Sequence, residues 1–180
     1  MKKLSVCALV VLTIIVGCSS ARHSSASKAG KFTVVKDSAD KVLKGYINRG
    51  VLERDTAFKW FAENLKYGTA DANAVEAFKK NAANFSVVIF GGTWCHDTQN
   101  LLPVFYRLVD KSGYPESKVT IVAVDRAKTA PDDLQKTYNV TNVPTFIILE
   151  KGKEIGRVVE YGKEGQVDKE LGEIVANFFK

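Results

Sequence analysis

The sequence predicts an α/β domain, in which helices flank a central mixed sheet, behind a helical N-terminal extension. Three observations predict this fold class. Strand-like and helix-like segments alternate from residue 84 to the C-terminus. Residues 85–90 are apolar except for Ser86, which is typical of a central strand buried on both faces. Residues 145–149 and 155–160 flank a Lys-Gly-Lys turn and therefore predict a hairpin.

The first residues resemble a bacterial lipoprotein signal peptide. Lys2 and Lys3 form a basic segment, and residues 4–16 form an apolar run that is short for a membrane span. Residues 15–18, Ile-Val-Gly-Cys, then resemble a lipobox. The resemblance implies removal of residues 1–17, lipid attachment at Cys18, and anchoring on the periplasmic side of the cell envelope, with the outer membrane favoured. The alternative is an ordinary secretory signal with an incidental cysteine.

An N-terminal extension separates this signal from the α/β domain. Residues 18–30 are rich in Ser, Ala and Lys, so we expect a flexible tether. Residues 31–83 predict a mostly helical extension. Its aromatic group, Trp60, Phe61 and Tyr67, is expected to pack onto the main domain, with ligand stacking as the alternative. The expected elements are a strand at 32–35 and helices at 39–48, 56–67 (capped by Asp55) and 71–83.

The α/β domain spans residues 84–180 and has the element order β-α-β-α-β-β-α. The closing helix is amphipathic, because its apolar residues recur at helical spacing. The expected strands cover residues 85–90, 118–124, 145–149 and 155–160, and the expected helices cover 98–110, 132–139 and 168–178.

The charge pattern argues against nucleic acid as a partner. The chain carries 26 Lys and Arg against 20 Asp and Glu, a net charge of +6. Acidic residues lie between the basic ones throughout, so the charges form a solvated surface and no basic stripe.

The cysteines leave one thiol for chemistry. Cys7 would leave with the signal peptide and Cys18 would carry lipid, so Cys95 would be the only free thiol of the mature chain. Cysteines of exported proteins mostly pair. An unpaired Cys95 is therefore either buried and inert or chemically used.

Cys95 lies where a buried strand passes into a helix. Unpaired N–H groups and the helix dipole favour a thiolate at such a position, and the thiolate is the nucleophile in disulfide exchange. Protonated His96 would strengthen this preference and Asp97 would oppose it, and both are expected to point outward. The only other histidine is His23 in the tether, so neither a metal nor another cofactor is expected.

Four local motifs resemble those of the thioredoxin family. Trp94 and Cys95 follow the first strand of the domain, and Pro103 lies eight residues after the cysteine. Residues 143–146, Val-Pro-Thr-Phe, resemble the cis-proline signature. The turn at 151–153 and the following Gly156 resemble the family's hairpin. The resemblance covers residues 84–180 and implies the thioredoxin fold.

The resemblance also implies a site. Cys95 would be the reactive residue, with Trp94, His96 and Thr98 beside it in the catalytic segment. A cis Pro144 would turn the backbone of Val143 toward the sulfur, and Val143, Pro144 and Thr145 would bind an extended substrate. The alternative is a trans Pro144 that merely begins a strand.

Two positions of this chain, Thr98 and Ile89, depart from the family pattern. Thr98 stands where the family has its second cysteine, so an internal disulfide cannot form. Its hydroxyl could donate to a Cys95 thiolate or cap the helix. Ile89 stands where the family has a buried acid. Asp125 and Arg126 lie either at the edge of the site or in a plain surface ion pair.

Two functions are compatible with these residues. The first is thiol-disulfide exchange through Cys95 alone, with protein or small-molecule thiols and disulfides as partners and an external thiol resolving the mixed disulfide. The alternative is a redox-inactive module that binds extended peptides or partner proteins. A peroxide-sensing thiol is a further possibility.

Overall fold

The computed structural model describes residues 30–180. The expected signal peptide, the lipid-attachment residue Cys18 and the tether up to residue 29 lie outside the described residues. Within residues 30–180, no helix combines the length and the apolar character that crossing a membrane requires.

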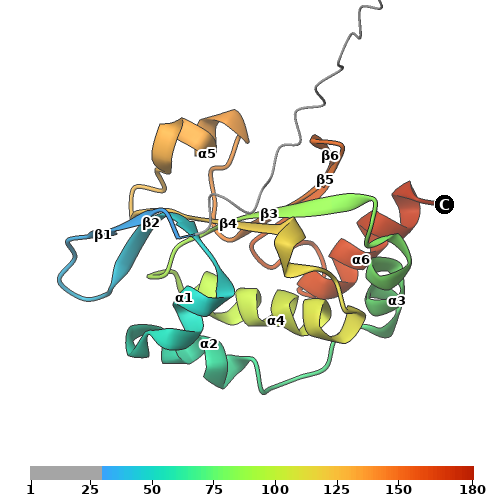
Figure 1. Cartoon of the computed structure of the whole chain (residues 1–180), viewed down its shortest axis with the longest axis horizontal. Coiled ribbons are helices and arrows are strands. Elements are labelled where there is room, and N and C mark those ends of the chain that lie inside the picture. Colours follow the sequence, from blue (N-terminus) through green and yellow to red (C-terminus); the bar gives the residue numbers. More distant parts are fainter. Residues whose placement is uncertain (1–29) are drawn as a thin grey trace, which may run out of the picture.

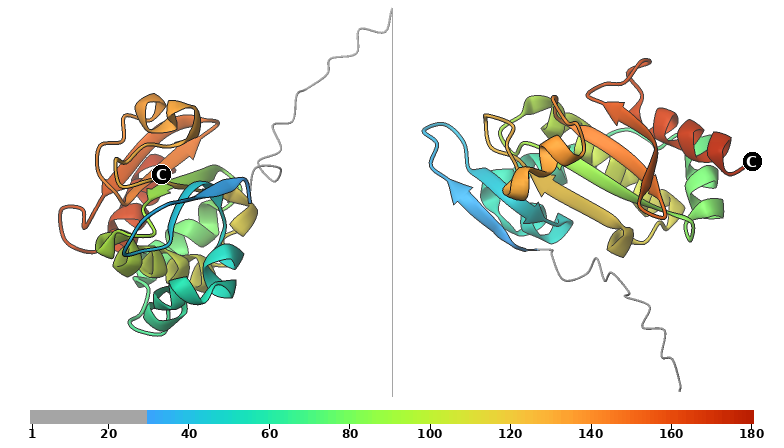
Figure 2. Two further views of the ribbon diagram at one scale, coloured as in Figure 1. Left: turned by 90° about the vertical axis from the view of Figure 1, so that its left-hand side faces the viewer. Right: turned by 90° about the horizontal axis from the view of Figure 1, so that it is seen from above.

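A six-stranded mixed sheet forms the middle of the molecule, with the strand order β1-β2-β4-β3-β5-β6 (Figures 1 and 2). The central strand β3 pairs in parallel with β4 and antiparallel with β5. Its side chains are buried on both faces, as the sequence predicts for this strand. The strands are β1 (Phe32–Val35), β2 (Val42–Ile47), β3 (Phe85–Gly91), β4 (Val119–Ala123), β5 (Thr145–Glu150) and β6 (Lys153–Val159).

Helices cover both faces of this sheet. In Figure 1, α5 lies on one side, and α1, α2, α3, α4 and α6 gather on the other. The long helix α4 leaves the end of β3 and packs against α2, α3 and α6. The helices are α1 (Arg49–Arg54), α2 (Lys59–Asn64), α3 (Ala72–Asn81), α4 (His96–Ser112), α5 (Leu134–Thr137) and α6 (Val167–Phe178).

The predicted thioredoxin fold is confirmed, and one element of the N-terminal extension is corrected. The helix expected at 39–48 is wrong, because Val42–Ile47 forms strand β2. This strand joins β1 in a hairpin and pairs antiparallel with β4. Gly45 lies within it at a φ of 128°, a conformation that suits glycine and no helix. A side chain there would collide with the carbonyl oxygen of Lys31.

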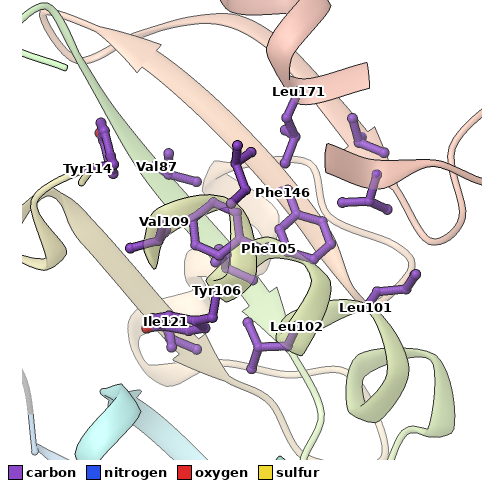
Figure 3. Close-up of a cluster of buried hydrophobic side chains, with 14 of the residues drawn as sticks. Val87, Leu101, Leu102, Phe105, Tyr106, Val109, Tyr114, Ile121, Phe146 and Leu171 are labelled. Atoms are coloured by element: carbon purple, nitrogen blue, oxygen red, sulfur yellow. The ribbon is translucent and has the colours of Figure 1, made fainter. Parts of the chain in front are cut away.

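Two hydrophobic clusters lie on the two faces of the sheet. Side chains of β3 alternate between them, so Ile89 enters the larger cluster and Phe90 the smaller one. The larger cluster fills the space between the sheet and α4, where the rings of Phe105 and Phe146 lie 5.7 Å apart (Figure 3). The smaller cluster lies on the α5 side of the sheet and includes Trp94 and Cys95 at its margin.

Aromatic residues dock the extension onto α4. Phe61 is fully buried and meets Tyr106 of α4 edge to face, with ring centroids 5.4 Å apart. Trp60 packs edge to face against Phe61. Tyr67 does not join this group, since it is 71% exposed. The packing role expected for the group therefore holds for two of its three members.

The contact between α3 and α6 depends on Gly172. A Cβ at this position would collide with the backbone and the side chain of Ala74 on α3. We predict that Gly172→Ala lowers the free energy of unfolding by about 1–3 kcal/mol, since the two helices must move apart. Helix propensity alone would predict the opposite, a higher free energy of unfolding for the alanine variant. Urea unfolding followed by circular dichroism measures the change, and exposed Glu173→Ala is the control in α6. A stabilised Gly172→Ala protein would contradict this packing.

Candidate functional site

Cys95 is the N-cap residue of α4. It follows the short loop after β3, and its N–H donates to the carbonyl oxygen of Gly92 at 2.9 Å. The residue is half-buried, and it is the one cysteine among the residues that the structure describes. Cys95 therefore directly precedes the first turn of α4, whose N–H groups have no partner within the helix, although its side chain forms no capping hydrogen bond with them.

The peptide bond between Val143 and Pro144 is cis, as the sequence predicts. The Sγ of Cys95 donates to the carbonyl oxygen of Val143 over 3.4 Å. The expected approach of the Val143 backbone to the cysteine is thus present. Pro144 is held in turn, because its carbonyl oxygen accepts a hydrogen bond from the N–H of Glu160 at 2.7 Å.

Thr145 supports this loop from inside. Its side chain is 1% exposed, and its hydroxyl donates to the carbonyl oxygen of Asn142 at 2.7 Å. The side chain of Thr145 therefore lies in the interior. Its part in the site is to hold the turn that carries Val143 and Pro144.

Thr98 is buried against the loop that precedes Cys95. Its hydroxyl oxygen accepts a hydrogen bond from the N–H of Gly92 at 3.2 Å. A Cβ on Gly91 would lie 2.9 Å from the methyl group of Thr98, so the two residues are in close contact. Among the described residues, no hydrogen bond joins Thr98 to Cys95. Thr98 fixes the loop in this structure.

Trp94 and His96 flank the cysteine differently. The indole N–H of Trp94 donates to the carbonyl oxygen of Val124 at 3.1 Å, and a Cβ on Gly92 would lie 2.7 Å from the indole. Trp94 thus forms a fixed, half-buried wall beside Cys95. His96 is exposed, as expected, whereas its neighbour Asp97 is half-buried.

Ile89 leaves the interior beneath the site without a titratable group at that position. It is fully buried, and its neighbours across the sheet are Ile121 and Phe146. An aliphatic side chain cannot accept or release a proton. Position 89 therefore supplies no proton donor or acceptor.

Thr93 ties the active-site loop to the N-terminal extension. It is 5% exposed, and its hydroxyl accepts from the N–H of Leu43 at 3.1 Å and donates to the carbonyl oxygen of Lys41 at 2.9 Å. The amide of Gln99 also donates to the carbonyl oxygen of Thr93 at 3.0 Å. The sequence did not indicate a role for Thr93, because its partners lie about fifty positions away and no local pattern predicts these contacts.

Asp125 and Arg126 each bind the β1–β2 hairpin and do not pair with each other. Asp125 pairs with Lys44 at 2.8 Å. Arg126 pairs with Asp37 and with Asp40, each at 2.6 Å. Its guanidinium also lies over the Trp94 ring, 5.3 Å from the centroid. Arg126 is therefore both ion-paired and at the edge of the Cys95 site.

These contacts lower the pKa of two carboxyl groups. The hydrogen bond from Arg126, helped by the N–H groups of Asp40 and Ala39, holds the pKa of Asp37 well below its usual range. Burial raises the pKa of Asp125, but hydrogen bonds from Lys44 and Thr129 outweigh it and lower this pKa overall. Both acids are therefore ionised at neutral pH, Asp37 in the hairpin as a partner of Arg126 and Asp125 as a partner of Lys44 in β2. Within residues 30–180, no three Cys, His, Asp or Glu side chains are placed to hold a metal ion.

Together, the sheet order, the cis proline and the cysteine at the start of α4 define a thioredoxin-fold protein with one thiol in its active-site segment. The thioredoxin family model matches residues 69–173, which is more than half of the chain. The chain belongs to the thioredoxin family. The match begins before α3, a helix that sequence reasoning placed in the N-terminal extension.

Several proteins are similar over the same region. Thioredoxin H2 of Arabidopsis thaliana is 29% identical over 97 residues, which cover 54% of this chain and 68% of that protein. A thioredoxin of Echinococcus granulosus is 33% identical over 95 residues, covering 53% of this chain and 82% of that protein. The match to the TPR repeat-containing thioredoxin TDX of Arabidopsis thaliana spans only 26% of that longer protein.

A solved structure shows the same fold over more of the chain. It is that of a Pseudomonas aeruginosa protein of unknown function, with a TM-score of 0.54 and 16% identity. The superposition covers 73% of this chain and 91% of that one. At this identity the likeness concerns the fold alone.

The buried hydrogen bond between Thr98 and Gly92 can be tested directly. We predict that Thr98→Val lowers the free energy of unfolding by about 1–3 kcal/mol, because the N–H of Gly92 is left buried without its acceptor. Thr98→Ser keeps the hydroxyl oxygen and is the matched control. Urea unfolding of the three proteins measures the difference. Equal stabilities of the Val and Ser variants would contradict the role of this bond.

The pairing of Asp37 with Arg126 predicts a pH-dependent stability. The folded-state pKa of Asp37 is lowered, so the contribution is complete above its ordinary value of 3.8 and is lost as the pH falls below it. We predict that Asp37→Asn destabilises the protein at neutral pH and that the difference shrinks in acid. Urea midpoints measured across the acid range test this, and a difference that grows in acid would refute it. Asp132→Asn, at an exposed carboxylate that forms no ion pair within residues 30–180, is the control.

Proposed function

We propose that this protein carries out thiol-disulfide exchange through Cys95 alone, as a membrane-anchored member of the thioredoxin family. Its partners are protein or small-molecule thiols and disulfides. The mixed disulfide that forms at Cys95 is resolved by an external thiol. The thioredoxin fold is consistent with thiol-disulfide redox reactions. The use of a single cysteine is the specific part of the proposal.

One observation carries the proposal. The sulfur of Cys95 is half-buried at the N-terminus of α4 and lies 3.4 Å from the carbonyl oxygen of Val143, beside the cis Pro144. A cysteine that served only to pack the interior would need neither a position at a helix N-terminus nor the neighbouring backbone of Val143. An extended substrate that pairs with the backbone near Val143 would bring its disulfide close to this sulfur.

The exchange proceeds in two balanced steps. The Cys95 thiol first loses its proton to solvent, and the thiolate attacks one sulfur of the substrate disulfide. A new S–S bond joins Cys95 to that sulfur, the old S–S bond breaks, and the other sulfur leaves as a thiolate. The thiolate of an external thiol then attacks the mixed disulfide at the substrate sulfur and releases Cys95 as a thiolate.

The resolving thiol must come from outside because Thr98 stands in the place of a second cysteine. The substrate sulfur ends in a disulfide with the external thiol, so the cycle as a whole is an exchange. A second external thiol would complete reduction of the substrate. With Ile89 at the buried position, the protons come from solvent or from the reacting thiols.

The proposed location rests on the sequence of the first residues. The lipobox-like residues 15–18 support lipid attachment at Cys18, and the tether to residue 30 would give the domain reach from the membrane. The domain would then face the periplasm, an oxidising compartment in which disulfides are abundant.

A redox-inactive module that binds extended peptides is the second candidate. It is favoured by Thr98, which is locked into the loop by Gly92, and by the aliphatic Ile89. Both residues are compatible with a thioredoxin fold that still binds peptides but has lost the second cysteine of its redox pair. The two candidates differ in what Cys95 does and can be separated by its reactivity.

The deciding measurement is the pH dependence of Cys95 alkylation. The full-length chain with Cys7→Ser and Cys18→Ser leaves Cys95 as the only thiol, and adding Cys95→Ala gives the blank. We predict that iodoacetamide reacts with Cys95 several-fold faster than with free cysteine at about pH 7, since the helix terminus favours the thiolate. Mass spectrometry of quenched samples measures the rates.

The outcomes separate the two candidates. Fast alkylation at neutral pH supports exchange through Cys95. Alkylation that follows free cysteine across the pH range, together with a Cys95→Ser protein that still binds extended peptides, would establish the binding module instead.

A further inference from the structure

The β1–β2 hairpin binds the active-site segment through three separate sets of contacts. Thr93 hydrogen-bonds with the backbone of Lys41 and Leu43. Lys44 pairs with Asp125 just after β4. The turn residues Asp37 and Asp40, reached from β1, both bind Arg126. The N-terminal extension is therefore attached to the Trp94–Cys95 loop and not only to the far side of α4.

Arg126 is the link between this hairpin and Trp94. Its Nε and Nη2 atoms donate to the two carboxylate oxygens of Asp37, at 2.6 and 3.2 Å, and Nη2 also donates to Asp40 at 2.6 Å. A two-point contact of this kind fixes the plane of a guanidinium. The plane is then held over the Trp94 ring at 5.3 Å, within the range of a cation–π interaction.

Trp94 is thus fixed from several directions. Its indole N–H is bound by the carbonyl oxygen of Val124, and its ring approaches Gly92 closely. Arg126 covers the ring from the side of the hairpin. Trp94 directly precedes the half-buried Cys95, and both residues pack at the margin of the smaller hydrophobic cluster, so a displaced ring would change the surface beside the cysteine.

We propose that Arg126 is a positioning residue: anchored by Asp37 and Asp40, it holds Trp94 as a wall beside Cys95 and so promotes the attack of the sulfur on a disulfide. This inference rests on the proposed exchange function of Cys95. It assigns a functional role to the β1–β2 hairpin, which lies outside the segment matched by the thioredoxin family model.

A plain surface ion pair would not account for this arrangement. Isolated exposed pairs contribute little to stability and hold no fixed geometry. Arg126 instead binds two carboxylates and an aromatic face at once, although its side chain is 46% exposed. Such a side chain loses little additional freedom when a substrate arrives, which is the advantage of preorganisation.

The test uses a neutral disulfide reagent and a protein with one thiol and one tryptophan. The parent is the full-length chain with Cys7→Ser, Cys18→Ser and Trp60→Phe, so that Cys95 and Trp94 are the only reporters. Dithiodipyridine is uncharged, so removing a cation does not change its encounter with the protein electrostatically. Its S–S bond breaks when Cys95 attacks, one pyridine-thiol forms the mixed disulfide, and the other is released and measured by absorbance.

We predict two changes when Arg126→Gln is added to this parent. The emission of Trp94 shifts to the red and acrylamide quenches it more strongly, because the ring is less covered. The reaction of Cys95 slows about fivefold, the factor that corresponds to the loss of one exposed cation–π contact. Arg126→Lys keeps the charge without the planar fork, so its reaction should also remain slow.

Arg49→Gln is the matched control. Arg49 pairs with Glu53 and Asp110 and lies over the ring of Tyr106 at 5.3 Å, which repeats the arrangement of Arg126. Asp110 lies near the opposite end of α4 from Cys95. Arg49→Gln should therefore leave both the Trp94 emission and the Cys95 rate unchanged.

Asp37→Asn combined with Asp40→Asn tests the anchor. This pair should reproduce the emission shift and the slower reaction, and adding Arg126→Gln to it should change little more, because the three residues act as one unit. Full additivity of the three substitutions would overturn the anchoring role of the hairpin.

The remaining outcomes each decide the inference. An unchanged emission, or a shifted emission with an unchanged rate, would overturn it, as would an equal slowing by Arg49→Gln. The proposed function is decided separately, by the parent's rate relative to free cysteine. The inference is decided by the ratio of the Arg126→Gln rate to the parent rate, so the two can fail independently.

Discussion

The site depends on the point where the buried strand β3 ends and α4 begins. Because β3 is paired on both edges and packed on both faces, its C-terminal end has a fixed position in the molecule. Cys95 caps the helix that leaves this point, and the cis bond before Pro144 brings the carbonyl oxygen of Val143 to its sulfur. The thiol is thereby held between a helix terminus and a backbone edge, and its chemistry follows from those two neighbours.

The residues around this thiol suit an exchange that is completed from outside. Thr98 occupies the position from which a second thiol would act, and it is used to hold the Gly92 loop. Ile89 gives the interior beneath the site packing and no proton donor. In the proposed exchange, the protein supplies the nucleophile and the reacting partners supply the second thiol.

The N-terminal extension is a structural part of the site. Its strand β2 extends the sheet beyond β4, and the β1–β2 hairpin binds Thr93, Asp125 and Arg126. Its helix α2 reaches the other side of the same segment, where the Asn64 amide donates to the carbonyl oxygen of Gln99 at 3.1 Å. The loop that carries Trp94 and Cys95 is thus held from both sides by residues that precede the matched family segment.

The sequence by itself determined the α/β class and the central strand, and its resemblance to the thioredoxin family implied the cis Pro144 and the approach of Val143 to Cys95. These depend on local patterns: an apolar run buried on both faces, helical spacing, and short motifs. Only the tertiary structure decided that residues 42–47 form a strand, since a short apolar segment suits either state until the edge of β4 offers backbone partners. It also decided the places of Thr145, Thr93 and Arg126. Their hydrogen bonds, ion pairs and ring contacts depend on how the folded backbone brings segments together, and several join residues far apart in the chain.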